Sequence, residues 1–214
     1  MKSDKKITIV DYGVGNLRSL IRAFEHFGAD VQISEDPHDI AESGSIVLPG
    51  DGAFRAGISG LAVRNLTGAV KDFAASGQAI LGICLGAQIL LSTGFEFGKY
   101  PGLGIVSGRV VKFPKLDEGG KVPQIGWNTI YPPKGKKWPK SILAAIKPAS
   151  SVYFVHSYII EPSEKKDILA LSSYAGYEFC SVIKSGNIYG SQFHPEKSGE
   201  VGLSIIKNFI DQYA

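Results

Sequence analysis

The stretch LGICLGAQ, residues 81–88, decides how this chain folds and where its chemistry lies. An apolar, strand-like segment (79–83) leads to Cys84, and a helix-compatible segment (87–91) follows. Glycines stand two positions before and two positions after the cysteine. This pattern is typical of a nucleophile elbow, a strand-to-helix turn so tight that side chains at the flanking positions would collide with their neighbours. The amide dipoles at the start of the helix favour the thiolate, so we predict that Cys84 is a nucleophile rather than a small buried residue.

A cysteine nucleophile needs a base, and the segment QFHPE (192–196) offers one. Residues two apart in an extended backbone point to the same side, and Pro195 keeps His194 away from helical angles. Glu196 can therefore hold one ring nitrogen of His194 while the other nitrogen faces the thiol. Taken alone, the segment is equally consistent with a surface turn, but together with the elbow it predicts a Cys84–His194–Glu196 triad.

The composition is that of an ordinary globular protein. The chain has 214 residues, of which 44% are hydrophobic and 20% charged, and we expect one domain covering residues 1–214. A net charge of +3 is too small to indicate nucleic-acid or membrane binding. The most basic stretch, 133–140, contains proline and glycine and is interpreted as a solvated loop, with an acidic partner as the alternative.

The two cysteines, Cys84 and Cys180, do not form a disulfide framework and indicate a reducing compartment. The apolar run near the N-terminus (7–10) is too short for a signal peptide, and no run is long enough to span a bilayer. We therefore expect a cytoplasmic protein. No cluster of side chains has the spacing of metal ligands, and we expect neither a metal nor another cofactor.

Strands and helices alternate in the first half of the chain, which indicates a parallel sheet covered by helices on both faces. The expected strands are 7–10, 31–34, 45–48 and 79–83, and the expected helices are 16–27 and one or two within 58–75. The predicted fold class is thus α/β, with three layers around a mostly parallel central sheet.

The second half is richer in strands and turns, and we expect an additional antiparallel region there. Its predicted strands are 104–113, 125–131, 152–160, 168–174, 179–184 and 188–193, before a last helix at 202–213. Sites in open α/β sheets form beyond the carboxyl ends of strands. Cys84, the loop after Leu48 and His194 all follow predicted strands, so they can meet in one crevice.

The loop PGDG (49–52) offers backbone amides to an oxyanion, together with the amide of Leu85. On its residues alone, an ordinary turn is as good an interpretation. Residues 82–88 and 193–196 together resemble the motifs of class I (triad) glutamine amidotransferases. Within that class the chain resembles the glutaminase subunits of imidazole glycerol phosphate synthase over nearly its whole length, through the segments DYGVGNL (11–17), PQIGWN (123–128), YFVHSY (153–158) and QFHPEKS (192–198).

The resemblance implies that glutamine is hydrolysed to glutamate and ammonia through a Cys84 thioester. His194 would move the protons and Glu196 would fix the imidazole tautomer, while the amides of Asp51 and Leu85 hold the oxyanion. The resemblance also implies that glutamine is bound by Gly50, Gly52, Gln88 and the backbone of His156, Ser157 and Tyr158. The side chain of His156 is interpreted as structural rather than as an acid or base.

The family also implies a partner, because only a short segment follows Glu196 and leaves no room there for a second catalytic domain. In the family this partner is a (β/α)8-barrel cyclase, which uses the ammonia to make imidazole glycerol phosphate and aminoimidazole carboxamide ribotide in histidine biosynthesis. The resemblance assigns Asn16, Trp127, Tyr153 and Lys197 to the interface and the ammonia route. For Trp127 and Tyr153, core packing is a close alternative.

Two residues depart from the family pattern. Asp51 stands where a branched apolar residue is more usual, and Gln124 stands where histidine is common. Three other functions remain open: a glutaminase subunit of another synthase, such as one for anthranilate or pyridoxal phosphate, a peptidase-like hydrolase, and a non-catalytic regulatory subunit. The intact triad residues argue against the last of these.

Overall fold

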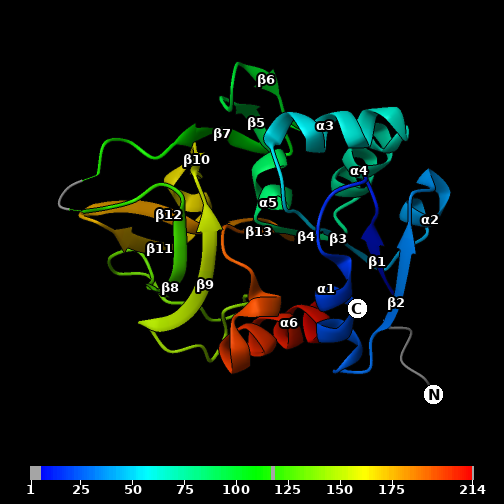
Figure 1. The fold of residues 1–214 in the computed structure, drawn as a ribbon. Helices are drawn as coiled ribbons and strands as arrows, with labels where there is room; N and C mark the ends of the chain where they lie inside the picture. Colours follow the sequence, from blue (N-terminus) through cyan, green and yellow to red (C-terminus); the bar gives the residue numbers. More distant parts are fainter. Residues whose placement is uncertain (1–5, 117–118, 214) are drawn as a thin grey trace.

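The structure is a computed structural model that describes residues 6–116 and 119–213 (Figure 1). Within these residues one eleven-stranded sheet runs through the molecule, and a separate two-stranded sheet lies beside it. Five neighbouring strands of the large sheet are parallel, in the spatial order β2 (Asp30–Ser34), β1 (Lys6–Val10), β3 (Ser45–Leu48), β4 (Ala79–Ile83) and β13 (Ile188–Ser191). Their carboxyl ends therefore meet at one edge, where the site is built.

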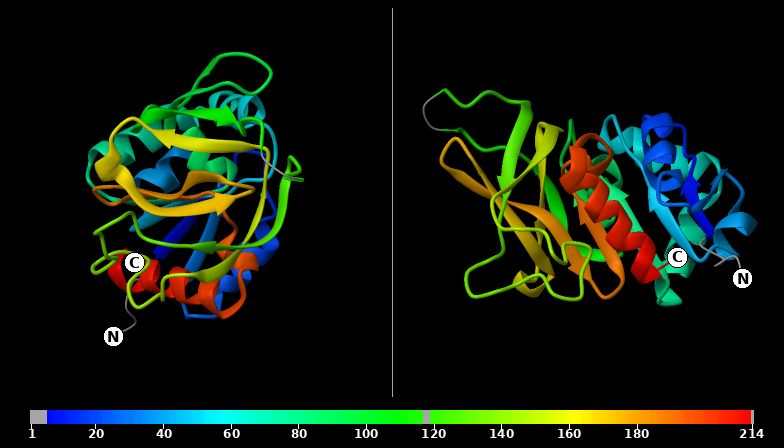
Figure 2. Two further views of the ribbon diagram at one scale, coloured as in Figure 1. Left: turned by 90° about the vertical axis from the view of Figure 1, so that its left-hand side faces the viewer. Right: turned by 90° about the horizontal axis from the view of Figure 1, so that it is seen from below.

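The central parallel strands β1, β3 and β4 are buried on both faces, which is why they read as apolar runs, whereas the edge strand β2 is partly exposed. In β3, Ile46 and Leu48 join the core on one face and Val47 joins the core on the other. Two helices, α1 (Leu17–Glu25) and α6 (Gly199–Tyr213), cover one face, and α6 lies along the sheet in Figure 2. The opposite face is covered by α2 (Pro37–Ala41), α3 (Phe54–Val63), α4 (Leu66–Ala75) and α5 (Leu85–Ile89).

The antiparallel half extends the sheet beyond β13. The strands β12 (Tyr177–Ser185), β10 (Tyr158–Pro162), β7 (Val106–Lys112), β5 (Leu91–Gly94) and β6 (Tyr100–Pro101) follow in that order, and β11 (Ile168–Tyr174) pairs with β12. The second sheet consists of β8 (Gln124–Ile130) and β9 (Ser150–His156). Two short 3-10 helices, η1 (Lys165–Asp167) and η2 (Pro195–Lys197), precede β11 and α6.

The predicted α/β class, with its mostly parallel sheet and antiparallel second half, is confirmed. The helical segment at 58–75 is part of two helices, because Asn65 takes a left-handed backbone angle (φ 59°) between them. The single strand expected at 152–160 is two strands that separate at Ser157 and pair with different partners. Among the described residues, the helices are too short or too polar to cross a bilayer.

Candidate active site

Cys84 occupies the sharp turn between β4 and α5. Its backbone has φ 51°, a left-handed angle that L residues rarely adopt, and its N–H donates to the Ser191 carbonyl at 2.7 Å. A Cβ placed on Gly86 would stand 1.9 Å from the Leu48 oxygen, and one on Gly82 would stand 2.7 Å from the Gly86 oxygen. The flanking positions therefore have no room for a side chain, as the elbow pattern predicted.

His194 and Glu196 form a buried pair at the carboxyl end of β13. The Nδ1 of His194 lies 2.8 Å from Oε1 of Glu196, and the two side chains are 2% and 5% exposed. His194 is extended (φ −98°, ψ 97°) and precedes η2, which begins at Pro195. Because the carboxylate is held at Nδ1, the Nε2 of the ring is the nitrogen that is free for proton transfer.

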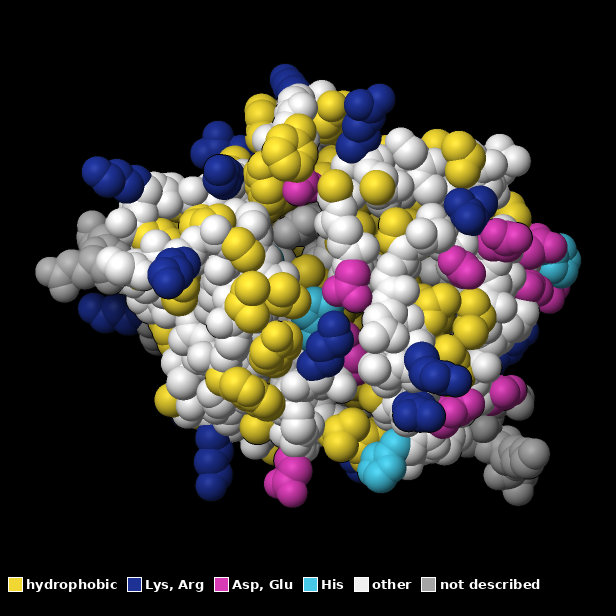
Figure 3. Space-filling model, viewed as in Figure 1, with side chains coloured by type: hydrophobic (Ala, Val, Ile, Leu, Met, Phe, Trp, Pro, Cys, Tyr) yellow, Lys and Arg dark blue, Asp and Glu magenta, His cyan; other side chains and the backbone are white. Residues whose placement is uncertain are grey.

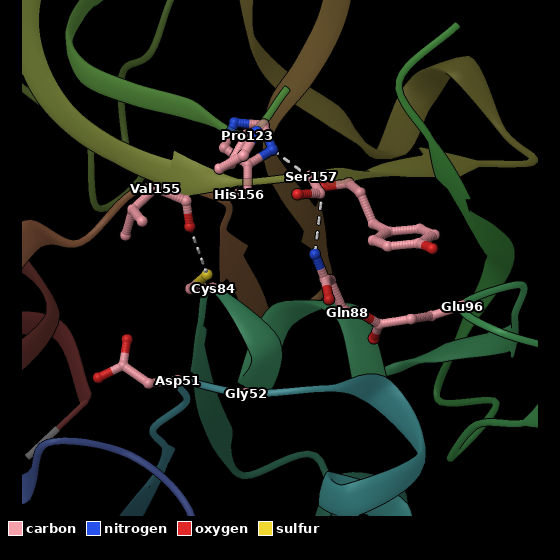
Figure 4. Close-up of a pocket in the computed structure, with 10 residues that line it drawn as sticks. Asp51, Gly52, Cys84, Gln88, Glu96, Pro123, Val155, His156 and Ser157 are labelled. Carbon is pink, nitrogen blue, oxygen red and sulfur yellow. Dashed lines mark hydrogen bonds between the residues drawn. The ribbon is translucent and has the colours of Figure 1, made fainter. Parts of the chain in front are cut away.

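The charge environment of His194 favours the imidazolium form. Burial alone lowers its pKa, but the contacts with Cys84 and Glu196 outweigh burial and raise the pKa to about 10. The sulfur is thus within electrostatic reach of the ring. The thiol hydrogen of Cys84, however, is donated to the Val155 carbonyl, whose oxygen lies 3.8 Å from the sulfur (Figure 4). Within the described part of the chain, Nε2 of His194 has no hydrogen-bond partner.

The carboxylate of Asp51 lies beside Nε2 of His194, the ring nitrogen that was expected to face the Cys84 thiol. Its Oδ1 is 3.6 Å from Nε2 of His194, and its Oδ2 is 3.9 Å from Nζ of Lys197. The sequence predicts that Asp51 acts through its backbone amide, with a carboxylate that can change how this amide is switched. In the structure its side chain also faces the catalytic ring.

A cavity of about 300 Å³ opens in front of the cysteine. Gln88 is anchored there by a hydrogen bond of 3.2 Å from its Nε2 to the Tyr158 carbonyl. Most of the residues that the sequence predicted to bind glutamine line this cavity. The cavity is lined by Asp51, Gly52, Cys84, Gln88, Glu96, Pro123, Val155, His156, Ser157 and Tyr158 (Figure 4). Gly50 does not line this cavity. It packs against the start of α5, where a Cβ would stand 2.4 Å from the Leu85 side chain.

His156 stands at the back of the cavity as a neutral ring. Burial lowers its pKa to about 4, and its Nδ1 lies 2.9 Å from the Tyr158 carbonyl. Rings of Phe113, Phe154 and Phe179 surround it. Gln124 lies directly opposite in the neighbouring strand and is 2% exposed. These surroundings fit the structural role that the sequence suggested for His156.

The expected interface residues fall on two sides of Asp51. A groove is lined by Asp51, Trp127, Tyr153, Val155 and Lys197, and Figure 3 shows charged and hydrophobic side chains meeting at this hollow. Trp127 is 59% exposed and meets Tyr153 edge to face at 6.1 Å. Core packing is therefore wrong for Trp127. Asn16 lies elsewhere, at a small cavity that also touches His194 and Glu196.

Comparison with known proteins agrees with this geometry. The family model described as "Glutamine amidotransferase class-I" matches residues 8–213.

The chain belongs to the class I glutamine amidotransferase family.

Two relatives with high sequence identity are named as subunits of imidazole glycerol phosphate synthase. The imidazole glycerol phosphate synthase subunit HisH 1 of Legionella pneumophila (strain Lens) is 49% identical over 208 residues, which cover 95% of this chain and 98% of that protein. The subunit HisH of Salinibacter ruber is 44% identical over 206 residues, which cover 94% and 92%. A chain of the PurLQS structure from Thermotoga maritima shares the fold, with a TM-score of 0.70 at 18% identity and coverage of 98% and 99%.

Two polar residues of this amidotransferase escaped the sequence analysis. The carboxylate of Glu96 lines the cavity and accepts a hydrogen bond of 2.6 Å from the Phe54 N–H. Gln192 is fully buried, and its Nε2 lies 3.8 Å from the Cys84 sulfur. Gln192 belongs to the segment 192–198 that carries the family resemblance, but that segment assigned it no role. Glu96 had no sequence signal, because its partner is 42 residues away. Within the described residues there is no group of acidic, histidine and cysteine side chains that could hold a metal ion.

Proposed function

We propose that this amidotransferase is the glutaminase subunit of imidazole glycerol phosphate synthase, with residues 1–214 acting as one domain. One observation carries the proposal: a strained cysteine elbow stands beside a buried His194–Glu196 pair, at a cavity large enough for an amino acid. The relatives from Legionella pneumophila and Salinibacter ruber, which match the chain along nearly its full length, both carry the name HisH.

In the proposed reaction, the Cys84 thiolate attacks the side-chain carbonyl carbon of glutamine and forms a carbon–sulfur bond. The negative charge moves to the carbonyl oxygen, which the amides of Asp51 and Leu85 stabilise. The imidazolium of His194 then gives a proton to the nitrogen, and ammonia leaves. Water attacks the resulting thioester while His194 takes up a proton, and glutamate and the free cysteine are released. Throughout, Glu196 holds Nδ1 and fixes the ring orientation.

The substrate fits the cavity by charge and hydrogen bonding. Gln88 is 5% exposed and fixed at the cavity wall, where its amide contacts the glutamine head group. Glu96 supplies a negative charge for the α-ammonium of the amino acid. The backbone at 156–158 and the loop residues Asp51 and Gly52 close the remaining sides.

The partner in this proposal is a (β/α)8-barrel cyclase that receives the ammonia. Trp127 and Ile125 are 59% and 64% exposed on the β8–β9 sheet, an arrangement suited to an interface anchor. Tyr153 and Lys197 line the same groove. Asn16, near His194, would face the ammonia route from the other side of Asp51. We assign the complex to the cytoplasm, since both cysteines are free thiols.

The isolated chain should hydrolyse glutamine slowly, because Asp51 faces the nitrogen that must serve Cys84. The test is reconstitution with the cyclase, followed by assays of synthesis from glutamine and from added ammonia. Cys84→Ser should abolish the glutamine-dependent reaction and leave the ammonia-dependent reaction intact. Loss of both reactions in an assembled complex would mean that Cys84 is structural and would overturn the proposal. Full glutaminase activity of the wild-type chain without a partner would overturn the role proposed for the cyclase.

A further inference from the structure

A buried amide outside the triad touches the reacting sulfur. Gln192 follows β13 and is fully buried, and its backbone N–H donates to the Ser181 carbonyl at 2.9 Å, which fixes the residue in place. Its side-chain Nε2 lies 3.8 Å from Sγ of Cys84, a hydrogen-bond distance for sulfur. Only one other hydrogen bond is made by the sulfur within the described residues, to the Val155 carbonyl at 3.8 Å.

The orientation of the Gln192 amide follows from its neighbours. The Tyr158 carbonyl can only accept, so the group of Gln88 that lies 3.2 Å from it must be the NH2 group. The same NH2 group lies 3.4 Å from the Gln192 side chain, which must therefore present its oxygen to Gln88. The remaining group of Gln192, its NH2, then faces the sulfur. A backbone carbonyl thus sets the direction of both amides without reference to the sulfur.

We propose that Gln192 is a fourth catalytic residue, which stabilises the Cys84 thiolate by donating a hydrogen bond to it. A hydrogen bond to the charged form of a group favours that form and strengthens when the acceptor is ionised. Gln192 would act on the sulfur from a different side chain than His194, whose own interaction with Cys84 also favours the charged pair. Gln88 lines the substrate cavity, so a chain of two amides also joins the glutamine pocket to the nucleophile. This inference rests on the proposed glutaminase function and adds a residue to it.

The test uses Gln192→Met, which keeps the length of the side chain and removes the donor. The rate of Cys84 alkylation by iodoacetamide is measured against pH in the complex with the cyclase. We expect the midpoint of the profile to rise by about one pH unit, which is about a tenfold loss of thiolate at neutral pH. The kcat for glutamine hydrolysis should fall by about the same factor, with KM nearly unchanged.

The matched control is Gln212→Met, which removes another amide donor, on α6 and bonded to the Ser141 carbonyl. Its alkylation profile should equal that of the wild type. Co-elution of the Gln192→Met chain with the cyclase in size-exclusion chromatography, together with a cooperative thermal unfolding transition, shows that the variant is folded and assembled. If the Gln192→Met variant does not fold, Gln192→Glu serves as the second variant. It keeps the shape of the side chain and should shift the midpoint of the alkylation profile further upward, because a carboxylate repels the thiolate.

An unchanged midpoint in a folded Gln192 variant would overturn the inference. Because iodoacetamide does not depend on glutamine recognition, the two proposals can fail separately. A complex that hydrolyses no glutamine but still shows the shift would refute the glutaminase proposal and leave the role of Gln192 standing.

Discussion

Replacement of Gly86 by alanine should destabilise the fold and disable the site together. The added Cβ would stand 1.9 Å from the Leu48 oxygen and 2.7 Å from the Leu48 carbonyl carbon. Relief of this contact requires the carbonyl to retreat by about 1 Å, since contacts shorter than 3.0 Å are not tolerated. Leu48 is buried and is the last residue of β3, between β1 and β4, so the retreat strains the sheet itself.

We expect a loss of about 3 kcal/mol in the free energy of unfolding, at the upper end for overpacking because the obstacle is backbone. For a chain of this size the melting temperature should fall by about 8 °C. The loop at 49–52 follows Leu48 directly, so the kcat of the complex should fall more than about tenfold through the displaced oxyanion amides.

The matched control is Gly68→Ala, which adds the same methyl group to an exposed position in α4 where nothing lies within 4 Å. This change should stabilise the chain by about 0.5–1 kcal/mol through helix propensity. Urea unfolding of the two variants gives both values. If Gly86→Ala unfolds within about 0.5 kcal/mol of the wild type, the close packing of the elbow against β3 is not as described.

Four further outcomes are expected. Asp51→Asn should raise glutamine hydrolysis by the isolated chain about fivefold, because the carboxylate no longer holds Nε2 of His194; a lower rate of glutamate release would contradict this. Glu196→Gln should lower the kcat of the complex about a hundredfold and spare ammonia-dependent synthesis, since the neutral amide no longer supplies at Nδ1, 2.8 Å away, the negative charge that stabilises the imidazolium; equal rates with glutamine would refute the pairing. The folded chain keeps His156 neutral with a pKa of about 4, so the free energy of unfolding should fall as pH drops from about 6.5 to about 4, and His156→Asn should flatten that decline; equal slopes for the two proteins would count against it. Trp127→Ala should weaken cyclase binding at least about tenfold by calorimetry without lowering the melting temperature, because the ring is 59% exposed; a large stability loss would point to core packing instead.

The buried strands were the most predictable part of the fold. The expected strands 45–48, 79–83 and 168–174 have the same bounds as β3, β4 and β11. In β3 and β4 every residue is buried, so the signal is a short apolar run between turns. The strands β5 and β6 were missed because they are short and partly exposed. The helix predicted at 87–91 ends at Ile89, because Leu91 begins strand β5 and pairs with Val106 of β7.

In the candidate site, too, residues placed by local sequence patterns were predictable, and residues placed by contacts between distant segments were not. Cys84, His194 and Glu196 were predictable because the turn and the alternation of an extended backbone are local properties. The side chain of Asp51 was not, since its position depends on His194 and Lys197, which are far along the chain. The contact of Gln192 with the sulfur spans 108 residues and is likewise a product of the tertiary fold.

The most direct test of the account is covalent labelling of the assembled complex with a glutamine analogue that carries an electrophile at the side-chain carbonyl position. The second thiol, Cys180, is an internal control, because burial raises its pKa far above the usual range. We predict that peptide mass spectrometry finds one label per chain, on Cys84, and that His194→Ala slows the labelling at least about a hundredfold. Labelling that is absent from Cys84, or that proceeds at the same rate without the imidazole, would contradict the account.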